Sequence, residues 1–308
     1  SRMFESMGIP VARTAYANVT VDDNYLGVYT MLQQLDKRFL KQHFGEENDA
    51  HNGNLYKCVP NENDTCTLQW RGGDPSLYHH THSCNPGYEE CGLVLKTNVD
   101  NAEQNDYSDL VHFLDVLNNS SNADFATAIE AVFDVDSFLK LAAVNVVLSN
   151  FDSYFGRVNN FYLYHRPDTD KFMMIPWDLN MSYGLYGCQQ QGSPMSMVRY
   201  PISDPVCRQD APDLPLADRI LAVPSYHDTY IQYVKQAAGS YLTDSLHQQW
   251  INEFDGLIGS LISTDPNYPE SYQAYRASLS NQINPDSVYS GYNLMDFVKR
   301  RREYILAQ

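Results

Sequence analysis

One stretch of the sequence decides the fold: residues 148–178, which read LSNFDSYFGRVNNFYLYHRPDTDKFMMIPWD. Its first part, up to Asn160, is rich in polar residues, and two runs of aromatic and aliphatic residues follow at 161–164 and 172–175. Residues 165–170 between the two runs, HRPDTD, include Pro and Asp, which favour turns. The pattern predicts a β-hairpin that is followed directly by Pro-Trp-Asp.

The residues that point to chemistry lie at the open end of this hairpin, before its first strand and after its second. Because a hairpin returns the chain to its starting point, we expect Asp152, Asn160 and Asp178 to share one small site. A phosphoryl-transfer site needs one carboxylate to orient the attacking hydroxyl group and an Asp/Asn pair to hold magnesium on the phosphates. In protein kinases these parts occur in the order catalytic Asp, metal-binding Asn, hairpin, metal-binding Asp. This sequence has the same order.

Each of these residues also has an ordinary structural interpretation. Asp152 lies where a helix meets a loop and can be a cap, Asp178 can accept backbone amides, and Asn159 and Asn160 can be turn residues. In a kinase the Asn follows the Asp by five residues, and Arg157 holds that position here, although Asn160 directly precedes the strand. A glycosidase with paired carboxylates is another alternative, but no Glu lies near the hairpin to act as its general acid.

Periodicity along the rest of the chain predicts an α+β protein. Alternating β-branched and aromatic residues predict strands at 11–21, 26–32 and 54–58. Apolar residues recur at helical spacing from Tyr107 onward. The predicted helices cover 36–44, two segments between 107 and 133, the strongly apolar 138–147, and then 214–223, 226–241, 244–262, 268–282 and 294–307. Residues 59–92, rich in Asn, Asp, Gly, Pro, His and Cys, are predicted to form an irregular insertion.

Composition excludes several classes of protein. The 308 residues are 43% hydrophobic, which is enough to bury a core and excludes disorder as the main state. The net charge of −17 repels phosphate backbones and anionic membranes, so we expect no nucleic-acid partner. The longest apolar stretch, 138–148, is much shorter than the roughly 20 residues that span a bilayer, so we expect no membrane insertion.

The cysteines lie in loop-like surroundings and favour disulfides. Short loops favour pairing Cys58 with Cys66, Cys84 with Cys91, and Cys188 with Cys207, while Cys58 with Cys91 is also compatible with the sequence. A zinc site is the alternative, without a C-x-x-C pair to support it. Its ligands would come from His79, His80, His82, Cys84 and Cys91.

Glycosylation sequons and composition predict an oxidising, extracellular environment. Asn-x-Ser/Thr sequons occur at Asn18, Asn63, Asn118, Asn119 and Asn180. The chain is also rich in Tyr and Asn and poor in Lys. We therefore expect a secreted protein, at a cell surface or in a coat.

Several segments together resemble the CotH kinase family. They are GVY at 27–29, QQLDKRFL at 33–40, GNLYK at 53–57, LKTN at 95–98, DVDSFL at 134–139, NFDS at 150–153, NFYLY at 160–164 and IPWDLNMSYG at 175–184. They occur in the family's order, and PWD followed by YG is the most specific part.

This resemblance implies an atypical protein-kinase-like fold. A small β-rich N-terminal lobe would comprise residues 1–100, with the Cys-rich insertion at 59–92. A larger helical C-terminal lobe, 101–308, would carry the catalytic hairpin at 150–184, and the two lobes would form one domain. The family has more of the N-terminal lobe upstream, so we expect this lobe to be incomplete.

The resemblance also implies an activity, the transfer of phosphate from ATP, with Mg²⁺ or Mn²⁺, to Ser or Thr of an extracellular or coat protein. Asp152 matches the catalytic aspartate and Asp178 the metal-binding one. Asn160 is a second metal ligand on the physical argument given above. Lys57 and Lys96 are candidates for binding the nucleotide, the alternative being solvated lysines at strand edges.

Departures from the family pattern keep a second function open. The family commonly has Glu where this chain has Gln33, and Gln brings no charge to a lysine or a metal. Arg157 can bind a phosphate or a peptide, or can block a metal. The alternative is a catalytically silent protein that keeps the kinase-like fold for a structural, coat or adhesion role outside the cell.

Overall fold

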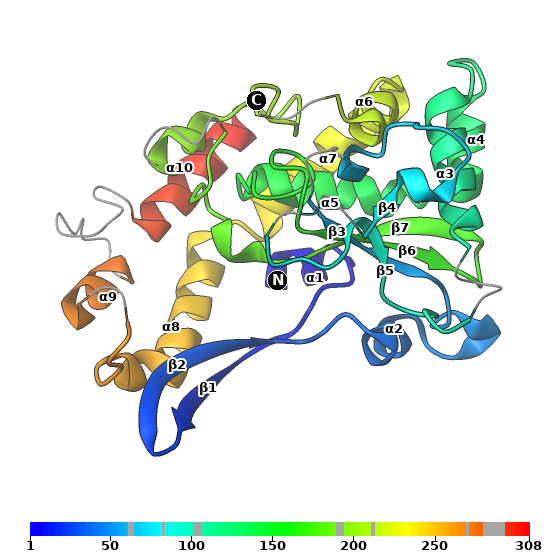
Figure 1. The fold of residues 1–308 in the computed structure, drawn as a ribbon. Helices are drawn as coiled ribbons and strands as arrows, with labels where there is room; N and C mark the ends of the chain where they lie inside the picture. The colour runs from blue at the N-terminus through cyan, green and yellow to red at the C-terminus, as the bar shows by residue number, and fades with distance from the viewer. Residues whose placement is uncertain are drawn as a thin grey trace.

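A five-stranded antiparallel sheet is the main sheet of the computed structural model, with strand order β4-β5-β3-β6-β7 (Figure 1). Its strands are β3 (Leu55–Val59), β4 (His79–His80), β5 (Cys91–Leu95), β6 (Phe161–Arg166) and β7 (Lys171–Pro176). The predicted hairpin is β6-β7. The structure describes residues 1–60, 65–81, 84, 86–101, 106–188, 194–210, 213–268, 271–279 and 293–308.

Helices make up most of the rest of the described chain, so the predicted α+β class is confirmed. They are α1 (Arg2–Ser6), α2 (Lys37–Phe44), α3 (Ser108–Asn119), α4 (Phe125–Val132), α5 (Val135–Val147), α6 (Pro215–Leu221), α7 (Pro224–Ser240), α8 (Asp244–Ile262), α9 (Tyr272–Ser278) and α10 (Leu294–Leu306). Short 3₁₀ helices cover Glu47–Asp49, Thr65–Thr67, Pro75–Leu77, Leu179–Met181 and Pro194–Arg199. Of the predicted helix 268–282, α9 is the part observed, and residues 269, 270 and 280–282 lie outside the described residues.

Both faces of the main sheet are buried, because successive side chains of a strand point to opposite faces. On one face, Leu163 of β6 and Met174 of β7 join the large core that contains α3 and α5. On the other face, Tyr162 and Ile175 pack with Phe39 of α2 in a second cluster. Lys57 pairs with Tyr162 across the ladder and so lies on the α2 face.

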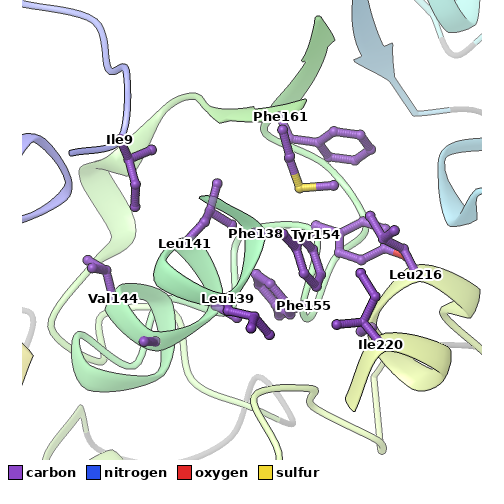
Figure 2. Close-up of a cluster of buried hydrophobic side chains, with 14 of the residues drawn as sticks. Ile9, Phe138, Leu139, Leu141, Val144, Tyr154, Phe155, Phe161, Leu216 and Ile220 are labelled. Carbon is purple, nitrogen blue, oxygen red and sulfur yellow. The ribbon is translucent and has the colours of Figure 1, made fainter. Parts of the chain in front are cut away.

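Helix α5 is the centre of the large core (Figure 2). Its residues Phe138, Leu139, Leu141 and Val144 are almost fully buried. They lie among Ile9 from the N-terminal segment, Phe155 and Phe161 from the loop and strand that follow α5, and Leu216 and Ile220 of α6 (Figure 2). A helix that is apolar around most of its surface has to be surrounded on most sides. The loop that leaves its C-terminal end, which carries Asp152, therefore starts from a rigid point.

Strands β1 (Thr14–Val21) and β2 (Asn24–Leu32) form a separate hairpin that extends beneath α8 (Figure 1). Strand β2 is held by the turn after α8: an Asp265 carboxylate oxygen accepts the Val28 amide at 2.8 Å, and the Asn267 side chain donates to the Leu26 carbonyl. A Cβ on Gly27 would lie 2.2 Å from an Asp265 oxygen, so only glycine fits there. Residues 11–32 were expected to form a hairpin, and the structure confirms it.

All six cysteines are paired, as Cys58–Cys66, Cys84–Cys91 and Cys188–Cys207. The short-loop pairing is confirmed, and the alternative Cys58–Cys91 pair is wrong. The zinc alternative is also wrong, because Cys84 and Cys91 form a disulfide with each other and leave no thiolate to bind a metal. His82 and the sequon at Asn63 lie outside the described residues. None of the helices in the described ranges is both long and apolar enough to cross a membrane.

Candidate active site

The open end of the β6-β7 hairpin brings the predicted residues together. Phe161 and Pro176 form the last pair of the ladder. Just beyond it, the Trp177 amide donates to the Asn160 carbonyl at 2.9 Å. Asp178 is the next residue, so it lies beside Asn160 although the two are distant in sequence. A purely local hairpin rule is sufficient to predict this proximity.

Asp152 joins the site through two asparagine side chains. Nδ2 of Asn160 donates to the Asp152 carbonyl oxygen at 2.9 Å, and Nδ2 of Asn159 donates to the carboxylate oxygen Oδ1 of Asp152 at 3.2 Å. The bond from Asn160 uses only its amide nitrogen, which leaves its Oδ1 able to bind a cation. Asn159 is the residue that sequence reasoning missed, because a second Asn in a turn carries no signal of its own.

Asp178 is electrostatically linked to both Asp152 and Lys57. Partial burial and then the negative charge of Asp152 raise the pKa of the Asp178 carboxyl, and the positive charge of Lys57 opposes this. Charges interact in this way only at short range or through protein interior. The two carboxylates and the lysine therefore form one charge cluster, and a divalent cation would be attracted to its acidic side.

Lys57 lies in the middle of β3, half-buried on the sheet face that bears Tyr162 and Trp177. Its ammonium nitrogen is 6.0 Å from the centroids of both rings. Burial and then the charge of Lys96 lower the pKa of Lys57, and Asp178 opposes this. Lys57 therefore faces the site.

Lys96 lies near enough to Lys57 for its charge to act on it, but Lys96 is exposed and lines a cavity of about 1040 Å³ that includes neither Lys57 nor Asp178. Of the two predicted nucleotide-binding lysines, the structure brings only Lys57 to Asp178.

The backbone around the site is unusual. Asn160, Asp178 and Val158 have left-handed φ values of 56°, 48° and 55°. Such values are uncommon for residues other than glycine and unfavourable for a β-branched residue such as valine. The tertiary structure has to hold these residues in place, which is a common property of functional sites.

A cavity of about 410 Å³ opens beside Asp178. Its walls come from the N-terminal segment before β1, from the β1-β2 hairpin, from the end of β7 and the loop after it, and from α8. They include Val11, Ala12, Thr14, Thr30, Leu32, Trp177, Asp178, Leu179, Asn180 and Phe254. The cavity places an apolar wall next to the charge cluster, which is the combination found in small-molecule sites. The sequon residue Asn180 lies at this wall.

The loop that follows Asp178 is fixed by the C-terminal helices. The Tyr183 hydroxyl is 3.0 Å from Nε2 of the buried His247 in α8, and the Tyr183 ring packs edge-on against Phe297 of α10. Nδ1 of His247 lies 3.1 Å from the Thr243 carbonyl oxygen and so carries the proton, which makes Nε2 an acceptor for Tyr183. Burial lowers the pKa of His247 and keeps this arrangement neutral.

Two residues that depart from the family pattern bond to partners outside the charge cluster. The Gln33 oxygen accepts the Arg13 backbone amide at 3.2 Å, and its Nε2 donates to Gln42. Arg157 is exposed and donates to the Tyr186 hydroxyl at 3.0 Å. Within the described parts of the chain, Gln33 pairs with no lysine, and Arg157 bonds to Tyr186 and not to Asp178.

Comparison with known proteins gives the family of this chain. The sequence model of the CotH kinase protein family matches residues 1–305. The chain belongs to this family. It is also 26% identical over 182 residues to the inner spore coat protein H of Bacillus subtilis strain 168. That alignment covers 59% of this chain and 44% of the relative, so the chain spans less than half of the relative's length. The α+β architecture is consistent with a CotH kinase-like fold.

Proposed function

We propose that this CotH family member transfers the γ-phosphate of ATP to Ser or Thr residues of a protein outside the cell. The observation that carries the proposal is the convergence of Asp152, Asn160 and Asp178 at one end of the β6-β7 hairpin, with Lys57 facing them. The set contains the parts that kinase chemistry requires, in the order in which kinases use them.

The donor atoms suit magnesium or manganese. Asp178 and Asn160 would hold the ion through a carboxylate and an amide oxygen, which are the ligands that hard cations prefer. When bound, the ion neutralises charge on the phosphates, which the acidic chain otherwise repels. Lys57 would add a second positive charge beside the phosphates.

Asp152 accepts the proton of the acceptor hydroxyl group. The acceptor oxygen forms a bond to the γ-phosphorus, the bond from that phosphorus to the β–γ bridging oxygen breaks, and ADP leaves. Asn159 holds one oxygen of the Asp152 carboxylate, which leaves the other to face the hydroxyl. Most of the rate enhancement in such reactions comes from positioning and from electrostatics.

A protein acceptor in a coat or at a cell surface fits three observations. The described chain has three disulfides, which persist in oxidising compartments. Its sequons would make it a glycoprotein if the chain is secreted through a pathway that glycosylates Asn. The relative from Bacillus is a spore coat protein by name.

A silent, kinase-like coat or adhesion protein is the second candidate. It is favoured by Gln33, whose neutral amide is occupied by Arg13 and Gln42 and offers no charge to a lysine or a metal. In that case the fold would serve as a scaffold.

Nucleotide binding separates the two candidates. In a thermal shift assay, ATP at millimolar concentration should raise the melting temperature only with Mg²⁺ or Mn²⁺, and Asp178→Ala should abolish the shift. Transfer of labelled γ-phosphate to Ser- and Thr-containing peptides should then be lost in Asp152→Asn, which keeps the shape of the side chain. No shift at millimolar nucleotide would favour the scaffold, and full transfer by Asp152→Asn would remove Asp152 from its role.

A further inference from the structure

Arg301 is a charged residue in the interior of the protein. It lies in α10, is 0% exposed, and is the largest fully buried side chain among the described residues. Its guanidinium donates to four backbone carbonyls: Val146 at 2.8 Å, Val147 at 3.4 Å, Val198 at 3.0 Å and Tyr200 at 2.6 Å. Two of these acceptors are the last residues of α5, and the other two are more than 50 positions further along the chain.

Burial of an arginine is costly unless its charge is compensated. Burial lowers the pKa of Arg301 to about 10. Among the residues that the structure describes, the phenols of Tyr230, Tyr304 and Tyr200 oppose this shift. The compensation comes from carbonyl oxygens at the C-terminal end of α5, where the helix dipole is negative. A lysine could not reach four carbonyls from one plane, whereas the guanidinium fork can.

The acceptors of Arg301 adjoin the loop that carries Asp152. The Val146 carbonyl also accepts the amide of Ser149, which has a left-handed φ of 48° and begins this loop. The Ser149 hydroxyl donates to the Met197 carbonyl at 3.2 Å, next to the Val198 carbonyl that Arg301 holds. Two residues after Ser149, the Phe151 ring packs against the Tyr200 ring, with 4.4 Å between the ring centroids. Arg301 thus joins the end of α5 to the segment 197–200, and the start of the loop lies between them.

We propose that Arg301 is a positioning residue that fixes the Asp152 loop from the last helix of the chain. The inference rests on the proposed function for its catalytic consequence, but its structural consequence stands alone. A guanidinium that bridges α5 to residues 197–200 limits the freedom of residues 148–160. Without it, the Val147 carbonyl loses the guanidinium and the Val146 carbonyl keeps only the Ser149 amide, so the loop samples other positions. Displacement of a catalytic carboxylate by about 1 Å is enough to slow a reaction strongly.

The variants that test this are Arg301→Lys and Ser149→Ala, with Arg300→Lys as the matched control. Arg300 is the neighbouring residue of α10, but it is exposed and bonds to Asp296 at 2.7 Å. Ser149→Ala removes the hydrogen bond from the Ser149 hydroxyl to the Met197 carbonyl, which also connects the start of the loop to the segment 197–200. It changes little volume, so it remains informative if Arg301→Lys fails to fold.

Amide hydrogen exchange provides the readout that needs no activity. We expect Arg301→Lys to speed exchange in residues 148–160 about tenfold while α3 exchanges at the parent rate, with a smaller effect in Ser149→Ala and none in Arg300→Lys. Unchanged exchange in 148–160 would overturn the proposal. A uniform increase over the whole chain would do the same, because it indicates general loss of stability.

Kinetics test whether the connection that Arg301 makes between α5 and residues 197–200 matters for catalysis. In the phosphotransfer assay we expect kcat of Arg301→Lys to fall about tenfold while KM for MgATP stays within about twofold, since Lys57 and Asp178 are untouched. A change in KM alone would overturn the assignment. If the parent neither binds MgATP nor transfers phosphate, the proposed function fails, and the exchange data still decide whether Arg301 fixes the loop.

Discussion

Nδ2 of Asn159 donates a hydrogen bond to Oδ1 of Asp152 across 3.2 Å. The adjacent Asn160 bonds to the backbone of the same aspartate. The two consecutive asparagines therefore have different roles. Asn159 orients the Asp152 carboxylate, and Asn160 joins the loop to the hairpin. This arrangement explains why the polar loop before β6 ends in a pair of amides.

Asn159→Ala should slow phosphotransfer about tenfold to a hundredfold, because the Asp152 carboxylate is then free to rotate away from the acceptor hydroxyl. The other amide atom, Oδ1 of Asn159, is buried and has no hydrogen-bond partner among the described residues, so its removal should cost little stability. Steady-state kinetics and thermal denaturation together check this. A parent-like kcat would show that the bond has no part in orienting Asp152.

Asp178→Asn should stabilise the protein in the absence of metal. The pKa of Asp178 is raised above its ordinary 3.8, so the folded state binds the proton more tightly than the unfolded state does. The stability that this provides is present below pH 3.8 and is lost as the pH rises through the raised pKa. A neutral amide avoids the loss, and Asn tolerates the left-handed backbone.

The gain should appear as a melting temperature about 1–3 °C higher at pH 7 without metal, and it should vanish near pH 3.5. Asp168→Asn is the control, since Asp168 lies in the turn at the other end of the hairpin and is paired with Arg166 at 2.7 Å. It should lower the melting temperature instead. A less stable Asp178→Asn at neutral pH would contradict the charge cluster described above.

Lys57→Met should weaken MgATP binding about tenfold or more, because loss of a charged hydrogen bond to phosphate costs roughly 1.5–3 kcal/mol. Lys96→Met should leave binding within about twofold, because Lys96 is exposed and lines a separate cavity. Isothermal titration of both variants provides the comparison. Equal losses of affinity in the two variants would mean that the nucleotide reaches the cavity lined by Lys96.

Replacement of Cys188 and Cys207 by Ala should cost about 3 kcal/mol of stability, from the 19-residue separation that the bond closes. It should also reduce transfer activity, because the disulfide packs against Phe151, the residue before Asp152, and the Cys207 amide donates to Phe155 at 2.8 Å. Denaturant melts and kinetics measure the two effects.

The control is replacement of Cys84 and Cys91 by Ala. That bond closes 7 positions in the insertion, so its loss should cost about 2 kcal/mol. It should leave kcat unchanged after correction for the folded fraction. A similar loss of kcat in both double variants would mean that the site depends on overall stability and not on the Phe151 contact.

Much of the fold follows from local rules. The apolar periodicity of α3, α5 and α8, the turn between β6 and β7 and the helix α2 are all readable, because each depends on residues within a few positions. The length of α9 was not readable, since its apolar pattern is weak. The short-loop disulfide pairing was readable because nearby cysteines meet most easily.

By itself the sequence determined the order of the chemical groups and their meeting at one hairpin, because Asp152, Asn160 and Asp178 are brought together by a turn of the intervening chain. Only the tertiary structure decided which lysine faces them, which amide orients Asp152 and what supports the loop. Lys57 reaches the site through strand pairing with β6, and Arg301 reaches α5 from 154 positions away. Such contacts depend on the packing of distant elements, and no local pattern of residues records them.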